Sequence, residues 1–341
     1  MTLYYKIIFN CKFEFIQRNS KTGPDLFKKI KKESIFNLLR IVISAGLIVY
    51  LILYVDIDSI YNKLILSNIS IILAVILLSF FNLFLQYEKW RLVCYNQLEI
   101  KDRKRVLYSL FYGISAGIFT PMKFGEYVAR AIPFEGKNIV DVSIATLVDK
   151  FIPMIIVLVI GLFVSLYYLV DIKLIELHSL LNLLVFFIFF ASVFFILFKT
   201  NRKRFISFFE WLKSFKILKK IFDKTKIINL LHGKYFLRIL FISLIYHLTF
   251  TSQLALLIYA FSNEFNYLLY LYIANLVIFV QVIIPPVALG ELGVREGATV
   301  YFANSLGLDP STGFNAALFL FIINFILPSF YGLFFLTKKL K

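Results

Sequence analysis

Two stretches of the sequence decide the fold: PMKFGEYVAR at residues 121–130 and PVALGELGVR at residues 286–295. Both contain the pattern Pro-x-x-x-Gly-Glu-x-x-x-Arg, and they begin 165 positions apart. That spacing far exceeds the roughly 20 to 50 residues of a solenoid repeat, so it predicts two half-proteins, each built around one copy. The shared positions are Pro121, Gly125, Glu126 and Arg130 in the first copy, and Pro286, Gly290, Glu291 and Arg295 in the second.

The sequence around the two motifs is typical of a membrane protein. Of its 341 residues 60% are hydrophobic and only 17% are charged, and the mean hydropathy is +0.82, which excludes ordinary soluble packing. A helix that spans the bilayer needs roughly 20 mostly apolar residues. We therefore expect an all-α integral membrane protein with about six full spanning helices. The apolar runs are residues 35–54, 69–86, 144–170, 180–198, 237–261 and 313–336.

Lysine and arginine in the loops predict the orientation of these spans. The net charge is +17, and the basic residues cluster before the first span, after the second span and in residues 199–226. The loops 56–68, 171–177 and 262–266 instead hold acids with few bases. We expect the basic loops and both termini in the cytoplasm. Residues 1–34 then form a basic cytoplasmic segment, and residues 199–226 form an interfacial helix on anionic lipid headgroups.

Two further apolar regions, residues 106–134 and 267–306, are broken in the middle by Pro and Gly, and they contain the two motifs. With the loop orientation above, the first region has to enter and leave from the cytoplasmic side, and the second from the outer side. We therefore expect two re-entrant helical hairpins in inverted repeat. They belong to a polytopic membrane domain of residues 35–338.

The residue types of the motif favour an anion-binding site. Pro121 and Pro286 stop an entering helix, while Gly125 and Gly290 permit a turn and leave a half-helix whose free N–H groups attract anions. Glu and Arg at i and i+4 share a helix face, so they can pair with each other or offer the guanidinium to a phosphate.

Burying each charge unpaired near the bilayer centre would cost about 2.5 to 3.5 kcal/mol on insertion scales, so the charged pairs indicate a polar cavity. The alternative stays open that the pairs are internal salt bridges that only fasten each hairpin. The predicted headgroup-binding residues are Glu126, Arg130, Glu291 and Arg295, with Asp149, Lys150 and Glu296 as candidates for the surrounding polar residues.

Other classes of function have no support in the sequence. Cys11 and Cys94 have no CxxC spacing and no nearby histidine, so we expect no metal site. Catalytic and cofactor motifs such as Gly-x-Ser-x-Gly, His-Glu-x-x-His and the phosphate-binding loop are absent, so we expect no catalytic residue and no cofactor. The basic residues recur between apolar runs and not on one face with aromatic platforms, which argues against a nucleic-acid partner.

The chain resembles the flippase-like transmembrane family named after the membrane domain of lysylphosphatidylglycerol synthase, from about residue 35 to residue 338. The resemblance depends on Trp90-Arg91, residues 121–130, the stretch Leu147-Val148-Asp149-Lys150, and residues 286–297. The chain has Lys150 where the family favours Arg. The resemblance implies the translocating membrane region without the soluble aminoacyl-transferring domain of the full synthases. It also implies a bacterial or archaeal plasma membrane.

The leading functional hypothesis is that the protein moves an anionic phospholipid, or a headgroup linked to a polyprenyl phosphate, between the two leaflets. A second hypothesis is an ion-coupled solute transporter of the same architecture. A third is a non-transporting subunit or anchor for a glycosyltransferase or lipid-modifying enzyme, in which the motif charges only hold the fold.

Overall fold

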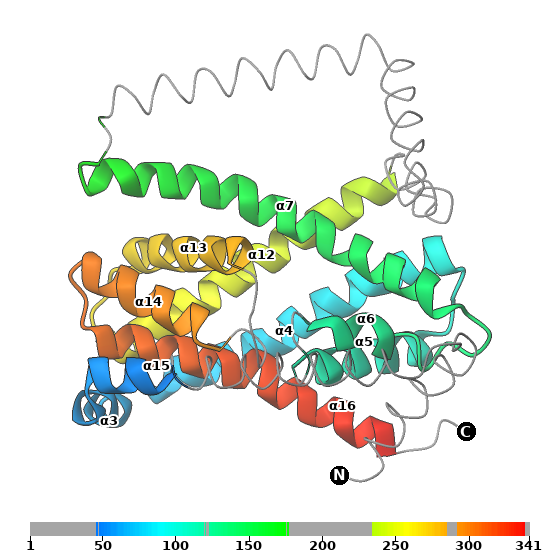
Figure 1. The fold of residues 1–341 in the computed structure, drawn as a ribbon, viewed down its shortest axis with the longest axis horizontal. Coiled ribbons are helices and arrows are strands. Elements are labelled where there is room, and N and C mark those ends of the chain that lie inside the picture. The colour runs from blue at the N-terminus through cyan, green and yellow to red at the C-terminus, as the bar shows by residue number, and fades with distance from the viewer. Residues whose placement is uncertain are drawn as a thin grey trace, which may run out of the picture. The chain divides into compact units, whose positions relative to one another are not determined.

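The computed structural model describes residues 46, 48–118, 120, 123–174, 176, 234–284 and 292–337 (Figure 1). These residues belong to one compact unit, residues 44–341, and they form helices and turns with no strand among them. The helices are α3 (Ile57–Ile65), α4 (Ile69–Val93), α5 (Arg103–Ile118), α6 (Phe124–Ala129), α7 (Ile139–Asp171), α12 (Lys234–Ser262), α13 (Tyr267–Ile283), α14 (Val294–Ser305), α15 (Pro310–Phe321) and α16 (Leu327–Thr337), with the π-helices η1 (Cys94–Leu98) and η4 (Ile322–Ile326).

Four helical stretches are long and apolar enough to cross a membrane: Ile69–Leu98, Ile139–Asp171, Tyr235–Ser262 and Pro310–Phe334. They match the runs predicted at 69–86, 144–170, 237–261 and 313–336. The chain is therefore a multi-pass α-helical membrane protein. The predicted span 180–198, most of the predicted span 35–54, the segment 1–34 and the interfacial helix 199–226 lie outside the described residues.

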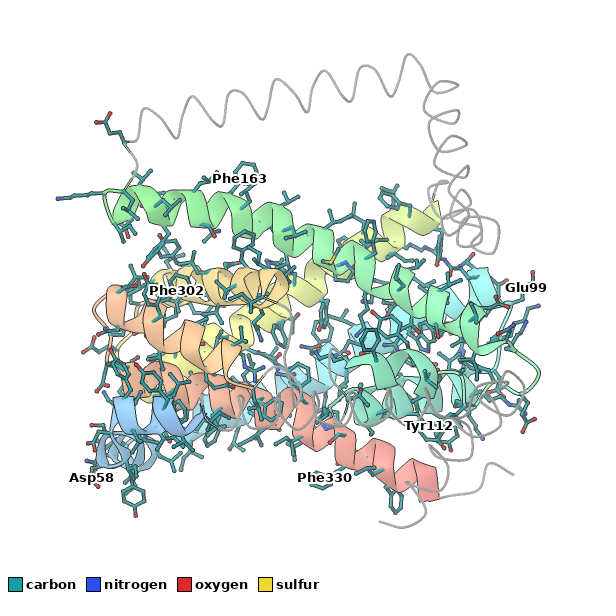
Figure 2. The ribbon with its side chains drawn as sticks, in the orientation of Figure 1. Asp58, Glu99, Tyr112, Phe163, Phe302 and Phe330 are labelled. Carbon is teal, nitrogen blue, oxygen red and sulfur yellow. The ribbon has the colours of Figure 1, made fainter. Side chains whose placement is uncertain are left out.

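The spanning helices α4 and α7 each have an exposed apolar face and a buried face. On α4 the exposed residues Leu73, Leu77, Phe80 and Phe84 recur every three or four positions, as expected for one helix face. Side chains of α7 divide in the same way: Figure 2 shows Phe163 on the outer side of this helix, and it is 45% exposed. Such exposed apolar surface is costly in water and suits contact with lipid tails.

Helix α12 packs against four other described helices, α4, α7, α13 and α15. Its core residues Leu254, Ile258 and Phe261 are fully buried. Polar side chains also cross this interface: Asn82 Nδ2 donates to Gln253 Oε1 at 3.0 Å, and both residues are buried. Hydrogen bonds of this kind fix helix pairs in apolar surroundings, where water is absent.

Each of the two regions that contain the motifs has a described helix on either side of its motif proline. In the first region α5 packs against α6, and in the second α13 packs against α14. Helix α5 ends at Ile118 and α6 begins at Phe124, while α13 ends at Ile283 and α14 begins at Val294. Of the motif residues, Pro121, Pro286, Gly290 and Glu291 lie outside the described residues.

Gly125 is needed for the close approach of α6 to α5. A Cβ at this position would lie 2.6 Å from the carbonyl oxygen of Ala116 and 2.7 Å from the Thr120 side chain. The Gly125 N–H donates to Thr120 Oγ1 at 2.8 Å. Immediately before α6, Lys123 has φ 56°, in the left-handed region, so the chain turns sharply into the short helix.

The structure differs from the sequence expectation in two of the spans. The second span was expected to end near residue 86, with Lys89 in a loop, but α4 continues to Val93 and Lys89 is buried on it. The last span was expected to be one continuous helix, but the π-helix η4 interrupts it between α15 and α16. Both differences affect the candidate site, since Lys89 and Phe325 take part in it.

Candidate functional site

The first motif forms the ion pair that its helical spacing allows. Glu126 lies on α6 and Arg130 follows its last turn, so the two side chains share one face at i and i+4. Arg130 Nη2 donates to Glu126 Oε1 at 2.7 Å. Both residues are buried, with the Arg130 side chain only 1% exposed. The pair is therefore shielded from solvent in the described structure.

This pair is part of a larger group that we call the first charge cluster: Lys89, Glu126, Arg130, Asp149 and Lys150. Arg130 Nη1 donates to Asp149 Oδ2 at 2.9 Å. Lys89 Nζ lies 3.4 Å from Asp149 Oδ1 and donates to the Asp149 carbonyl oxygen at 2.9 Å. Lys150 Nζ lies 2.8 Å from Glu126 Oε1. The cluster therefore ties α4, α6 and α7 together through charged side chains.

The first charge cluster has three bases and two acids, so it carries one excess positive charge. Lys89 and Arg130 are buried within it, while the Lys150 side chain is 41% exposed. An uncompensated charge is expensive in a medium of low dielectric constant. The cluster is therefore electrostatically suited to an anion next to its exposed member, Lys150.

Arg130 is held in place on its other sides as well. Its guanidinium lies 4.3 Å from the centroid of the Trp90 ring, a favourable cation–π arrangement. Trp90 Nε1 donates to Ser109 Oγ, which in turn donates to the Arg130 carbonyl oxygen at 2.6 Å. A Cβ on Gly113 would lie 2.6 Å from Arg130 Cγ, so glycine makes the space for this side chain.

The second motif is arranged differently. Arg295 and Glu296 lie in the first turn of α14, and both are fully buried. Arg295 Nη2 donates to Glu296 Oε1 at 3.0 Å, and the other carboxylate oxygen accepts from the Gly293 N–H at 2.7 Å. Glu296 thus caps its own helix and pairs with Arg295. The motif acid Glu291 lies outside the described residues.

Arg295 has unused hydrogen-bonding capacity. Its Nε and Nη1 atoms are buried and have no hydrogen-bond partner within the part of the chain that the structure describes. The guanidinium lies 5.3 Å from the Phe321 ring centroid and 5.5 Å from that of Phe325. The aromatic rings stabilise the positive charge without supplying an acceptor to these two donors.

The two motifs converge on Phe325, in the π-helix η4. Lys123, the third residue of the first motif, places its Nζ atom 4.7 Å from the centroid of the Phe325 ring. Arg295 of the second motif lies against the same ring. Residues about 170 positions apart in the sequence therefore contact the same aromatic side chain.

Sequence reasoning had named Glu126, Arg130, Asp149 and Lys150, which the structure brings together, and Arg295 with Glu296, which form a separate pair. It missed Lys89 and Phe325. For Lys89 a signal was present: the buried residues of α4, Asn82, Leu85, Lys89 and Val93, recur at helical spacing through the position of the lysine. For Phe325 no comparable signal exists, since the sequence is rich in phenylalanine and the π-helix has no sequence signature.

Comparison with known proteins supports the family assignment. A search of curated proteins gives no match. The family described as the lysylphosphatidylglycerol synthase TM region matches residues 37–332, which is most of the chain. That region includes every residue of the first charge cluster as well as Arg295, Glu296 and Phe325. The chain belongs to the lysylphosphatidylglycerol synthase transmembrane-region family.

Proposed function

We propose that this protein moves an anionic phospholipid, or a lipid-linked headgroup that carries phosphate, between the leaflets of a plasma membrane. The single observation that carries this proposal is the buried guanidinium of Arg295, which has two donor nitrogens without a partner among the described residues. A buried donor that lacks an acceptor is costly, so such a group suits a site that a ligand fills. The family, whose name refers to a lipid-modifying synthase, supports a lipid as that ligand.

In this proposal the helix pairs α5–α6 and α13–α14 are re-entrant hairpins that enter the bilayer from opposite faces. Their motif ends, at Lys123 and Arg295, meet at Phe325. The phosphate binds at this meeting point while the acyl chains stay in the lipid. Movement of one half of the inverted repeat against the other then exposes the site to each leaflet in turn.

The first charge cluster has a different role in this proposal. Both Nη atoms of Arg130 already donate to carboxylates, at 2.7 and 2.9 Å. A phosphate would have to displace Glu126 or Asp149 to reach them. The cluster therefore fastens the first hairpin to α4 and α7, and its excess positive charge attracts the anionic headgroup toward the site.

Vesicle translocation tests the proposal. The purified protein is reconstituted into vesicles that contain a fluorescent phosphatidylglycerol, and transfer between leaflets is followed by chemical quenching of the outer leaflet. We expect faster transfer than in protein-free vesicles, and a loss of most of this rate in Arg295→Gln. The matched control is Arg105→Gln, which removes an exposed arginine that pairs with Asp102 and Glu135.

Two results would contradict the proposal: a parent rate equal to that of protein-free vesicles, or an Arg295→Gln rate equal to the parent rate. Arg295→Lys separates folding from binding, because it keeps the charge and loses the planar fork that binds two phosphate oxygens. We expect this variant to fold and to retain only part of the activity. Its thermal unfolding in detergent is compared with that of the parent.

A further inference from the structure

We propose that Lys123 and Arg295 bind one phosphate group together, and that Phe325 holds the two cationic groups at the spacing that this requires. This inference rests on the proposed function and deepens it, because it assigns the phosphate to a site shared by the two motifs. It also adds Lys123 and Phe325, which are not among the repeated positions of the motif.

The geometry is the first support. Lys123 Nζ lies 4.7 Å and Arg295 Cζ 5.5 Å from the centroid of the Phe325 ring. The two cationic centres are therefore no farther apart than the sum of these distances. Beside the Phe325 ring, a phosphate would accept charge-assisted hydrogen bonds of about 2.7 to 2.9 Å from both groups, on two different oxygens.

The second support is the type of buried polar atom that has no hydrogen-bond partner among the described residues. Arg295 Nε and Nη1 are buried and unpartnered within the described ranges, and so is Nδ2 of Asn324, the neighbour of Phe325 in η4. All three atoms are donors. A ligand that satisfies the two Arg295 donors needs acceptor atoms, and a phosphate offers several acceptor oxygens with a negative charge.

The π-helix η4 explains how Phe325 reaches both residues. A π-helix fits extra chain into one turn, so the side chains after it are rotated relative to a regular α-helix. Residues Ile322–Ile326 form this turn between α15 and α16. Phe325 thus faces both motifs at a point where the last span departs from regular geometry. Such π-turns occur often at functional sites.

The comparison of the two motif arginines assigns the ligand to this place and not to the first charge cluster. Arg130 has carboxylate partners on both Nη atoms, whereas the partner of Arg295 among the described residues is Glu296, on a single Nη atom. Among the described residues, the two motif arginines therefore differ in their pairing. In the first half, Lys123 takes the binding role that the repeated pattern would give to Arg130.

Binding measurements on the full chain in detergent test this inference. The probes are short-chain phosphatidylglycerol, a short-chain diacylglycerol that lacks the phosphate, and inorganic phosphate. We expect Lys123→Gln to weaken phosphatidylglycerol binding about tenfold, as for loss of one charge-assisted hydrogen bond, and Lys123→Arg to restore most of it. Phe325→Leu should weaken binding as well. The matched control is Lys104→Gln at an exposed position, which should bind as the parent does.

A double-mutant cycle gives the sharpest readout. If one phosphate contacts both groups, the Lys123→Gln and Arg295→Gln effects are not additive, and the double variant is weakened by less than the product of the two single effects. If inorganic phosphate binds and its binding weakens in Lys123→Gln, the ligand is a free anion. If phosphatidylglycerol binds and inorganic phosphate does not, the ligand is a lipid headgroup. Both results support the shared site.

Three results would overturn the shared site: parent-like affinity of Lys123→Gln, additive effects in the cycle, or equal binding of the phosphate-free diacylglycerol. These failures differ from failure of the proposed function. If Arg295→Gln loses binding and translocation while Lys123→Gln loses neither, the function stands and the shared site fails. If binding follows the expected pattern but vesicles show no translocation, the site stands and the function fails.

Discussion

Arg130 Nη1 donates a hydrogen bond of 2.9 Å to Oδ2 of Asp149, so the end of α6 is fastened to the middle of α7 by a buried ion pair. Through Lys89 the same aspartate also reaches α4. One carboxylate thereby fixes three helices, including two of the long apolar ones. The first motif is therefore fixed against α4 and α7 by Lys89 and Asp149, which lie outside the motif.

The first prediction concerns Asp149→Asn. This change removes a buried carboxylate that faces Lys89 and Arg130, and it raises the excess charge of the cluster from one to two. Breaking one partner of a buried pair costs about 3 to 5 kcal/mol, so we expect a clear decrease in the thermal unfolding temperature in detergent. Glu135→Gln is the control, because Glu135 is 79% exposed in its pair with Arg105 and should contribute about 0 to 1 kcal/mol. Equal stability of the two variants would contradict the role of Asp149.

The second prediction concerns the coupling of Lys89 to Asp149. Lys89→Met keeps the length of the side chain and leaves Asp149 paired with Arg130. We expect the Lys89→Met, Asp149→Asn double variant to be more stable than the sum of the single effects predicts, by about 0.5 to 3 kcal/mol. Denaturant unfolding of the parent and the three variants measures this difference. Additive effects would show that the two residues act independently.

The third prediction concerns Gly113, on α5. In Gly113→Ala the new Cβ would lie 2.6 Å from Arg130 Cγ and 3.0 Å from its Nε. We expect overpacking to cost about 1 to 3 kcal/mol and to disturb the ion pairs of Arg130. Gly297→Ala on α14 is the control, since its Cβ would meet only Leu51 Cδ1, at 3.9 Å. That variant should be neutral, or more stable by up to about 1 kcal/mol through helix propensity. A parent-like unfolding temperature for Gly113→Ala would show that Arg130 has room to move.

The sequence allowed the main helices and part of the site to be predicted, and the reasons are physical. Apolar runs of sufficient length mark spanning helices whatever their neighbours are, so residues 69–86, 144–170, 237–261 and 313–336 were recognised correctly. The pair Glu126 and Arg130 followed from helical spacing alone. Local rules of this kind need no knowledge of the packing.

What could not be predicted depends on contacts between distant segments. Lys89 was assigned to a loop because a charge usually ends an apolar run, but Asp149, 60 positions later, compensates this lysine inside the protein. The position of Phe325 in the site follows from the π-helix η4, and its role follows from contacts with Lys123 and Arg295, which come from two other regions of the chain. The pairing of Arg130 with Asp149 is also tertiary, since the two residues lie 19 positions apart, at the end of α6 and within α7.

The last prediction separates the capping role of Glu296 from its electrostatic role. In Glu296→Gln a single amide oxygen replaces the two carboxylate oxygens that accept from Gly293 and Arg295. We expect a lower unfolding temperature without lipid. We also expect short-chain phosphatidylglycerol to raise the unfolding temperature of this variant more than that of the parent. Without the Glu296 carboxylate, the lipid phosphate supplies the negative charge that pairs with Arg295.

The control for this prediction is Asp309→Ala, at the N-cap of α15. Asp309 Oδ1 accepts from the Ser311 N–H at 2.9 Å, so its loss removes a cap worth about 1 kcal/mol without changing the charge next to Arg295. This variant should unfold at a lower temperature than the parent, but lipid should raise its unfolding temperature by the same amount as in the parent. If Glu296→Gln behaved in the same way as Asp309→Ala, Glu296 would act only as a helix cap. A larger rise in Glu296→Gln alone would mean that the carboxylate competes with phosphate for Arg295.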